Sequence, residues 1–252
     1  MKVYSYLLNR IEEKKAAYLI LIDPDKLSEE QLLEFIKICD NSDVDGYLVG
    51  GSLITAGDLE KTIDNIKSVS KLPTILFPGS VNQVNGKADA LFYLSLLSGR
   101  NPEHLIGNHV IAAPLIKKVG IETISVGYLL IESGKTTTAE YMSGTKPIPA
   151  HKPQIAAATA LAGEYLGVKM IYLEAGSGAD NPVPVEMVSI VSKVISIPII
   201  VGGGIKTPQQ AEERVRAGAK IIVTGNYFEN SSNWDKVKEF SKAIRIKKSF
   251  LV

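Results

Sequence analysis

Three glycine-rich turns, each following a short apolar run, have the clearest capacity for chemistry in this sequence. The runs at 170–173, 197–201 and 221–223 are rich in Ile, Val or Tyr, which is typical of strands buried on both faces. They lead into Gly176-Ser177-Gly178, Gly202-Gly203-Gly204 and Gly225-Asn226. Glycine leaves backbone N–H groups open to an anion, and a helix that begins just afterwards turns its positive end toward the same point. The three turns therefore predict a phosphate-binding site.

A glutamate, Glu174, ends the first of these runs, directly after Tyr172 and Leu173. An unpaired carboxylate is costly to bury in apolar surroundings, so its position needs a reason. As a functional group it would be a general base or would anchor a substrate hydroxyl. The alternative is a structural salt bridge to a neighbouring strand, since ion-pair networks also occupy such positions.

Oxygen-bearing side chains also follow the first two predicted strands. Asp23 comes directly after the apolar run 18–22, and Ser52 follows the run 46–49. Mg2+ takes one or two protein oxygens and completes its octahedron with water and substrate phosphate, so Asp23 is a candidate Mg2+ ligand and Ser52 a candidate second oxygen. The alternative for Asp23, which precedes Pro24, is a simple turn residue.

The elements that would position these residues alternate along the whole chain. Eight apolar runs alternate with about seven amphipathic segments; the runs are 18–22, 46–49, 74–77, 90–94, 122–128, 170–173, 197–201 and 221–223. This alternation favours an α/β fold, a single (β/α)8 TIM barrel, over a doubly wound sheet. A helical crossover makes a unit of roughly 30 residues, so 81–89 is too short for one and helix 3 is expected to be absent. Barrel active sites lie at the C-terminal ends of the strands, where all these candidates fall.

Four further expectations concern the remaining segments. Residues 4–14 form a short amphipathic helix that would close the bottom of the barrel, and 132–149 form a long polar loop of the kind that is usually functional or disordered. Cys39 falls in an apolar helical pattern and is expected in the core. His104, His109 and His151 lack ligand spacing and are expected in surface or capping roles.

Composition narrows the class of protein. The 252 residues, 45% hydrophobic and 22% charged, fit one domain over 1–252. A net charge of +1 gives no general field for nucleic acid, and a single cysteine excludes a disulfide framework or a metal–thiolate cluster. No signal peptide or run of membrane-spanning length occurs, so we expect a cytoplasmic protein without stable membrane insertion. Because the outer helices of barrels often associate, a homo-oligomer is expected.

The strand-end motifs together resemble the geranylgeranylglyceryl phosphate synthase family, which includes the bacterial PcrB-type heptaprenylglyceryl phosphate synthases. The likeness runs from about residue 17 to 226. The motifs that carry it are Leu21-Ile22-Asp23-Pro24, Val49-Gly50-Gly51-Ser52, Phe77-Pro78-Gly79, Ser98-Gly99-Arg100-Asn101-Pro102, the stretch 172–178, Val201-Gly202-Gly203-Gly204-Ile205 and Thr224-Gly225-Asn226. The PcrB branch has a lysine where this chain has Leu21, which with the long 132–149 loop places the chain nearer the archaeal-type geranylgeranyl branch.

The resemblance implies a modified barrel without helix 3. It also implies transfer of a polyprenyl group, expected to be geranylgeranyl, from its diphosphate to the 3-hydroxyl of sn-glycerol 1-phosphate, with Mg2+. Carried over by position, Asp23 and Ser52 fall on the Mg2+ positions, Glu174 would be the base, and Arg100 is a candidate for an added diphosphate contact. The glycerol-phosphate positions are Tyr172, Leu173, Glu174, Ala175, Gly176, Ser177, Gly178, Gly203, Gly204, Gly225 and Asn226.

Two other functions stay open on the residues alone. One is another phosphate-binding barrel enzyme, an isomerase or lyase, which would use paired acid and base groups on opposite strands. The other is a noncatalytic barrel that binds glycerol phosphate or lipid. It would keep the glycines but would not need Glu174 or the pair Asp23 and Ser52.

Overall fold

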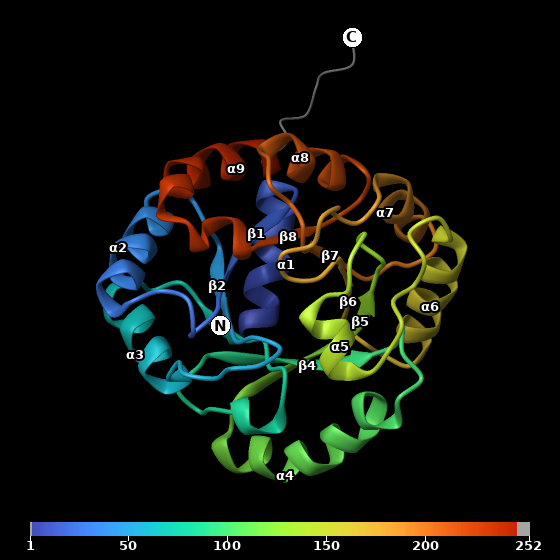
Figure 1. The fold of residues 1–252 in the computed structure, drawn as a ribbon, viewed down its shortest axis with the longest axis horizontal. Coiled ribbons are helices and arrows are strands. Elements are labelled where there is room, and N and C mark those ends of the chain that lie inside the picture. The colour runs from blue at the N-terminus through green and yellow to red at the C-terminus, as the bar shows by residue number, and fades with distance from the viewer. Residues whose placement is uncertain (1, 246–252) are drawn as a thin grey trace.

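Eight parallel strands close into a barrel in which each strand pairs with the next and β8 pairs with β1 (Figure 1). The computed structural model describes residues 2–245, so Met1 and 246–252 of the expected domain lie outside the described residues. The strands are β1 (Ala17–Ile22), β2 (Gly46–Val49), β3 (Thr74–Leu76), β4 (Ala90–Leu96), β5 (Glu122–Leu130), β6 (Met170–Glu174), β7 (Ile199–Gly202) and β8 (Ile221–Thr224). Every apolar run contributes one strand, and the predicted TIM barrel is confirmed.

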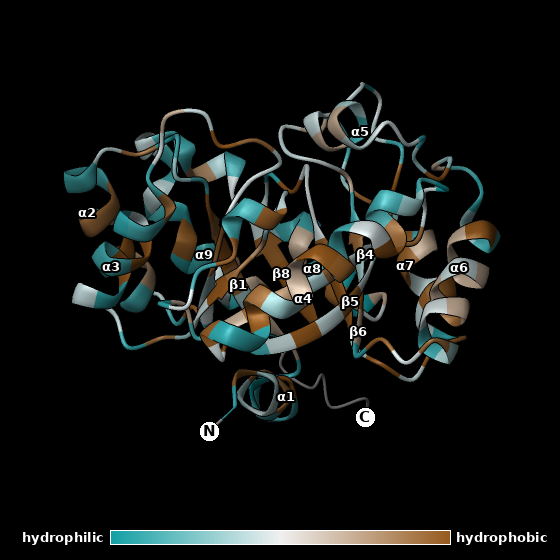
Figure 2. Cartoon of the chain, turned by 90° about the horizontal axis from the view of Figure 1, so that it is seen from below, coloured by the Kyte–Doolittle hydropathy of each residue, from teal (hydrophilic) through white to brown (hydrophobic). Residues whose placement is uncertain are grey.

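Helices surround the barrel and also lie at its two ends (Figures 1 and 2). They are α1 (Val3–Lys14), α2 (Glu29–Asp40), α3 (Leu59–Val69), α4 (Asn108–Val119), α5 (Thr138–Ser143), α6 (Pro153–Tyr165), α7 (Val185–Ser192), α8 (Pro208–Arg216) and α9 (Val237–Ile244). Two of them, α2 and α8, begin with a capping box, which Ser28 and Thr207 form respectively and which satisfies free backbone amides at the helix start. None of the described helices is long and apolar enough to cross a membrane.

The connection from β3 to β4 contains only one turn of 3-10 helix, Val81–Gln83. The expected absence of a full helix here is therefore confirmed. The connection from β4 to α4 is also irregular, because a π-helical turn, Glu103–Gly107, precedes α4. Both irregular segments lie on the same side of the barrel and leave room for a groove, described below.

The barrel sheet separates two apolar cores. Alternate strand residues such as Leu19, Phe92 and Tyr172 fill the interior, while their neighbours pack against the outer helices. Val3 and Leu7 of α1 join the interior core. The carboxylate of Glu122 on β5 accepts the backbone N–H groups of Val3 at 2.6 Å and Tyr4 at 3.1 Å. Helix α1 thus closes the N-terminal end of the barrel, as expected (Figure 2).

Residues 132–149 are not a loop throughout, which corrects the expectation from the sequence. They contain α5, which lies over the open end of the barrel (Figure 2). The Thr137 side chain caps its first turn by accepting the Glu140 N–H, and Gly144 ends it in the left-handed conformation. A helix of this length is too short to show an apolar period, so only its caps were visible in the sequence.

Candidate active site at the mouth of the barrel

Glu174, the last residue of β6, belongs to the inward-facing set of strand residues and is buried, with 6% of its surface exposed. Its Oε1 atom accepts the backbone N–H of Gly176 at 2.6 Å. Burial raises the pKa of Glu174 to about 7, against the lowering effect of that hydrogen bond. No salt bridge to Glu174 occurs within residues 2–245. The structural ion pair considered as an alternative is therefore absent, and the carboxylate is poised to exchange a proton near neutral pH.

Aromatic rings form the floor beneath this carboxylate. The rings of Phe77 and Tyr128 both lie 5.4 Å from the ring of Tyr172. The Tyr172 hydroxyl is buried and completes no hydrogen bond of ordinary geometry in the described chain, although it is close enough to Glu174 to favour the charged carboxylate. Burial and the nearby carboxylate together raise the pKa of both tyrosines well above their usual range. The phenols therefore stay neutral.

The glycine turns after β6, β7 and β8 meet beside Glu174. A Cβ atom built on Gly203 would overlap Glu174 Oε1 and lie 2.6 Å from the backbone N of Gly176, while one on Gly178 would lie 3.8 Å from Asn226 Oδ1. The backbone is left-handed at four of these glycines, Gly176, Gly178, Gly203 and Gly204, which have φ of 99°, 68°, 79° and 67°. Only glycine adopts these angles without strain, so the turns bring bare backbone close together.

The other expected glycerol-phosphate residues fall into two groups. The side chains of Leu173 and Ala175 pack in the core between the sheet and the helices, so these two residues offer only their backbone to the mouth. Ser177 and Asn226 lie exposed at the rim, where the Asn226 amide donates to the Glu229 carboxylate at 2.9 Å. Gly225 precedes the 3-10 helix Asn226–Glu229, so the N-terminus of this turn faces the same region.

The expected Mg2+ residues lie at the ends of β1 and β2. Asp23 is partly buried, and its Oδ1 atom accepts the Asp25 N–H at 3.0 Å. A Cβ on Gly51 would lie 3.5 Å from Asp23 Oδ2, so the glycine before Ser52 keeps the space beside this oxygen open. Burial raises the pKa of Asp23, which a bound cation would offset. One carboxylate and one hydroxyl suit Mg2+, which completes its shell with water and phosphate. Within residues 2–245, no group of three or more His, Cys, Asp or Glu side chains could hold a metal ion.

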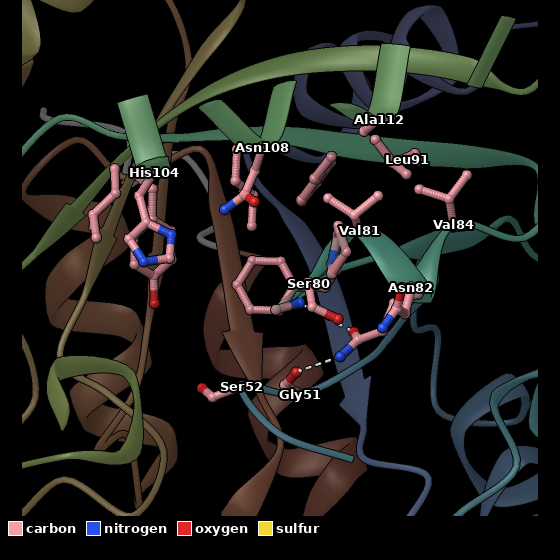
Figure 3. A pocket seen from close by; sticks show the side chains of 18 of the residues that line it. Gly51, Ser52, Ser80, Val81, Asn82, Val84, Leu91, His104, Asn108 and Ala112 are labelled. Carbon is pink, nitrogen blue, oxygen red and sulfur yellow. Dashed lines mark hydrogen bonds between the residues drawn. The ribbon is translucent and has the colours of Figure 1, made fainter. Parts of the chain in front are cut away.

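A groove of about 530 Å³ leads from this edge of the mouth over the side of the barrel that lacks a helix (Figure 3). Its lining includes Phe92 and Leu94 of β4, which face the barrel interior. It also includes Leu91 and Tyr93 of the same strand, which face outward. The groove therefore crosses the top of the sheet. Most of its wall is apolar, and the apolar side chains include Phe92, Tyr93, Leu94, Tyr128 and Leu130.

The polar wall that α4 and the turn before it contribute to this groove was not predicted from the sequence. His104, Asn108 and His109 line it (Figure 3). The expectation of a surface role was wrong for His109, which is buried, lies 3.2 Å from Ser95 Oγ through its Nε2, and has its pKa lowered by burial. Its position three residues before Ala112, on the buried face of α4, was the signal that could have located it.

The structure does not direct Arg100 into the groove. Its guanidinium is exposed and donates to the backbone carbonyls of Leu97 at 3.2 Å and Gly99 at 2.7 Å, within its own turn. Cys39 is buried in the core, as expected, and His151 is exposed.

Comparison with known proteins agrees with this geometry. The profile of the PcrB family matches residues 9–244. The chain is 44% identical to the geranylgeranylglyceryl phosphate synthase of Chitinophaga pinensis over 96% of each chain. It is also 44% identical to that of Pyrococcus horikoshii, over 97% of this chain and 95% of the relative.

A solved structure extends the likeness to three dimensions. The (S)-3-O-geranylgeranylglyceryl phosphate synthase of Thermoplasma acidophilum, in complex with sn-glycerol-1-phosphate, superposes with a TM-score of 0.91 at 32% identity. The match covers 97% of this chain and 99% of the other. The chain therefore belongs to the PcrB family of geranylgeranylglyceryl phosphate synthases.

Proposed function

We propose that this protein is a prenyltransferase that joins the geranylgeranyl group of geranylgeranyl diphosphate to the 3-hydroxyl of sn-glycerol 1-phosphate and releases diphosphate. The observation that carries the proposal is the position of a buried carboxylate between a glycine cradle and an apolar groove. The Glu174 carboxylate accepts the N–H of Gly176 in the glycine cradle. Tyr128, which lines the groove, packs on Tyr172, and Tyr172 precedes Glu174 by two residues. The names of the relatives and the ligand of the Thermoplasma acidophilum enzyme support both substrates.

The glycine turns would hold the phosphate of glycerol phosphate. Backbone N–H groups and short helix N-termini attract an anion without a lysine or arginine, which suits a chain of nearly balanced charge. The residues that we assign to this substrate are those expected from the sequence, from 172 to 178 with Gly203, Gly204, Gly225 and Asn226. Pinning the phosphate fixes which hydroxyl points toward the groove, and such positioning removes a large part of the barrier.

Glu174 would act as the general base. A carboxylate would repel the phosphate, so its partner is the hydroxyl that reacts. As the bond between the allylic carbon and the diphosphate oxygen breaks, the glycerol oxygen forms the ether bond and its proton passes to Glu174. Oε1 accepts the Gly176 N–H, and since each carboxylate oxygen has two lone pairs, the carboxylate keeps acceptor capacity for the hydroxyl.

Asp23 and Ser52, which follow the neighbouring strands β1 and β2, would hold Mg2+. Bound there, Mg2+ neutralises the charge that develops on the departing diphosphate. Asp23 presents Oδ2 beside Gly51, and Ser52 follows on the same loop. This assignment places the leaving group at the start of the apolar groove, which would hold the prenyl tail.

Support for the expected homo-oligomer comes from the outer face of α4 and the turn before it. Ile106, Val110 and Ile111 are exposed by 60%, 65% and 63% of their surfaces. Apolar side chains gathered on one exposed helix commonly mark protein contacts, so we assign this face to a second copy of the chain. Sedimentation of the wild type and of I111E would test the assignment, since the charged variant should dissociate.

The direct test of function is a transfer assay with labelled prenyl diphosphates of 15, 20 and more carbons and with each of the two glycerol phosphate enantiomers. We expect an ether product from sn-glycerol 1-phosphate with the C20 donor preferred. Absence of product from every donor would refute the proposal.

A further inference from the structure

We infer that Gln83 is a positioning residue for the loop that carries Ser52, placed in the segment that replaces the missing helix. Gln83 ends the 3-10 turn after β3 and is only 7% exposed. Its Nε2 donates to the Gly51 carbonyl at 3.0 Å, and its Oε1 accepts the Gly79 N–H at 3.0 Å. One side-chain amide thus joins the loop after β2 to the loop after β3. The inference rests on the proposed function, because Ser52 belongs to its Mg2+ and diphosphate side.

Beside this amide, the two loops also approach each other backbone to backbone. A Cβ on Gly79 would overlap the Gly51 carbonyl oxygen and lie 2.8 Å from the Ser52 Cα. A Cβ on Gly50, which has φ of 148°, would likewise overlap the Phe77 carbonyl oxygen. With such close contact, the orientation of the Gly51 peptide is set by what its carbonyl bonds to. In the described chain that partner is Gln83.

The far end of the same loop is held in a matching way. The Asp25 carboxylate accepts the backbone N–H groups of Thr55 at 2.8 Å and Gly57 at 2.5 Å. Ser52 therefore lies in a loop fixed at both ends, by Gln83 near its start and by Asp25 near its end.

An apolar residue at 83 would fill the same space without fixing this geometry. A buried amide must satisfy its donors and acceptors, and here Gln83 does so by bonding to two backbone groups that face each other across the loops. Its loss would leave the Gly51 carbonyl and the Gly79 N–H without this partner. The Gly51–Ser52 peptide could then rotate, and the Ser52 hydroxyl would leave the position that a cation needs.

The test measures metal affinity as well as turnover. Q83E keeps one acceptor but places a second oxygen against the Gly51 carbonyl, and Q83M keeps the length without hydrogen bonds. Isothermal titration with Mn2+ in the presence of inorganic diphosphate should show affinity lower by about 10- to 100-fold, as for other residues that support metal ligands. The Kd of sn-glycerol 1-phosphate should stay at the wild-type value, because its site is formed by the turns after β6, β7 and β8.

N85D is a matched control on the same segment. In the wild type, the Asn85 amide donates to Glu60 at 3.0 Å and accepts the Lys87 N–H at 2.8 Å. Asn85 does not line the groove, so the same amide-to-carboxylate change should leave Mn2+ affinity unaltered. Folded Q83E and Q83M variants with a lower Tm but Mn2+ affinity within about twofold of wild type would overturn the inference. Wild-type protein that binds Mn2+ and diphosphate but forms no ether product would instead overturn the proposed function alone.

Discussion

Gly203 lies directly against the carboxylate of Glu174, with no room for even a methyl group between them. The glycine comes from the turn after β7 and the carboxylate from the end of β6, strands that pair in the barrel. The proposed phosphate site and the proposed general base are thus parts of one packed unit, so a substitution in the glycine turn should also displace the Glu174 carboxylate.

The first prediction concerns G203A. The added methyl group would overlap Glu174 Oε1, and the φ of 79° is strained for alanine by about 1–3 kcal/mol. We expect a lower Tm, weaker binding of glycerol phosphate and a lower kcat. G120A is the control, because Gly120 has φ of 72° but nothing within 4 Å of an added Cβ, so it isolates the backbone strain. Wild-type kcat and Kd in folded G203A would contradict the packing.

The second prediction is that E174Q lowers kcat by about 10²- to 10⁴-fold, the usual effect of losing a general base. The amide keeps an oxygen for the Gly176 N–H but cannot take up a proton. The Kd of glycerol phosphate, measured by calorimetry on the same preparation, should change little. A variant that keeps near wild-type kcat would remove Glu174 from the catalytic role.

The third prediction is the pH dependence of stability that Glu174 imposes. Its pKa is about 7 in the folded protein against an ordinary value of 4.5, so the folded state binds this proton more tightly than the unfolded state. The protonated carboxyl group contributes roughly 3 kcal/mol to the free energy of unfolding. This contribution is complete below pH 4.5 and is lost as the pH rises to 7. E174Q should therefore be more stable than wild type at pH 8, with the difference narrowing toward pH 5. Equal denaturation midpoints at both pH values would contradict the raised pKa.

The fourth prediction follows from the same pKa but concerns turnover. Only the ionised carboxylate accepts a proton, so kcat should fall about tenfold per pH unit below pH 7 and level off above it. Measurements at saturating substrate separate this ionisation from that of free glycerol phosphate. The residual activity of E174Q should lack the inflection.

The fifth prediction is that D23N nearly abolishes activity, because a neutral amide is a far poorer Mg2+ ligand than a carboxylate. Excess EDTA should do the same to wild type, with recovery on adding Mg2+. Glycerol phosphate should still bind to D23N, since its assigned site is formed by backbone groups of the turns after β6, β7 and β8, although β8 is the neighbour of β1 in the barrel. Full turnover in EDTA would exclude a metal at Asp23.

Much of the fold was readable because its signals are local. Each strand is a compact apolar run, and the glycines that end β6 and β7 have left-handed φ values that explain their presence. The absence of a helix after β3 was predicted because the segment 81–89 is too short for one. Helix α5 escaped prediction because its evidence was confined to the caps Thr137 and Gly144.

The groove was harder to predict because its wall is assembled from distant segments. The amide of Gln83 and the imidazole of His109 look like ordinary polar residues in the sequence. Each becomes informative only when the fold buries it beside a second element, Gly51 for one and Ser95 for the other. The raised pKa of Glu174 has the same origin, since it depends on the surrounding strands and turns rather than on its neighbours along the chain.

The opening where a helix is missing also shapes the kinetics. The turns after β7 and β8 lie across the barrel from β3 and β4, so the two proposed substrate sites are separate, and we expect that neither substrate blocks the entry of the other. Initial rates with both concentrations varied should thus fit a random-order scheme. In the proposed reaction, the ether product would occupy both sites, with its phosphate at the glycine turns and its prenyl tail in the groove. It must release two attachments to leave, so we expect the ether product to dissociate more slowly than glycerol phosphate does.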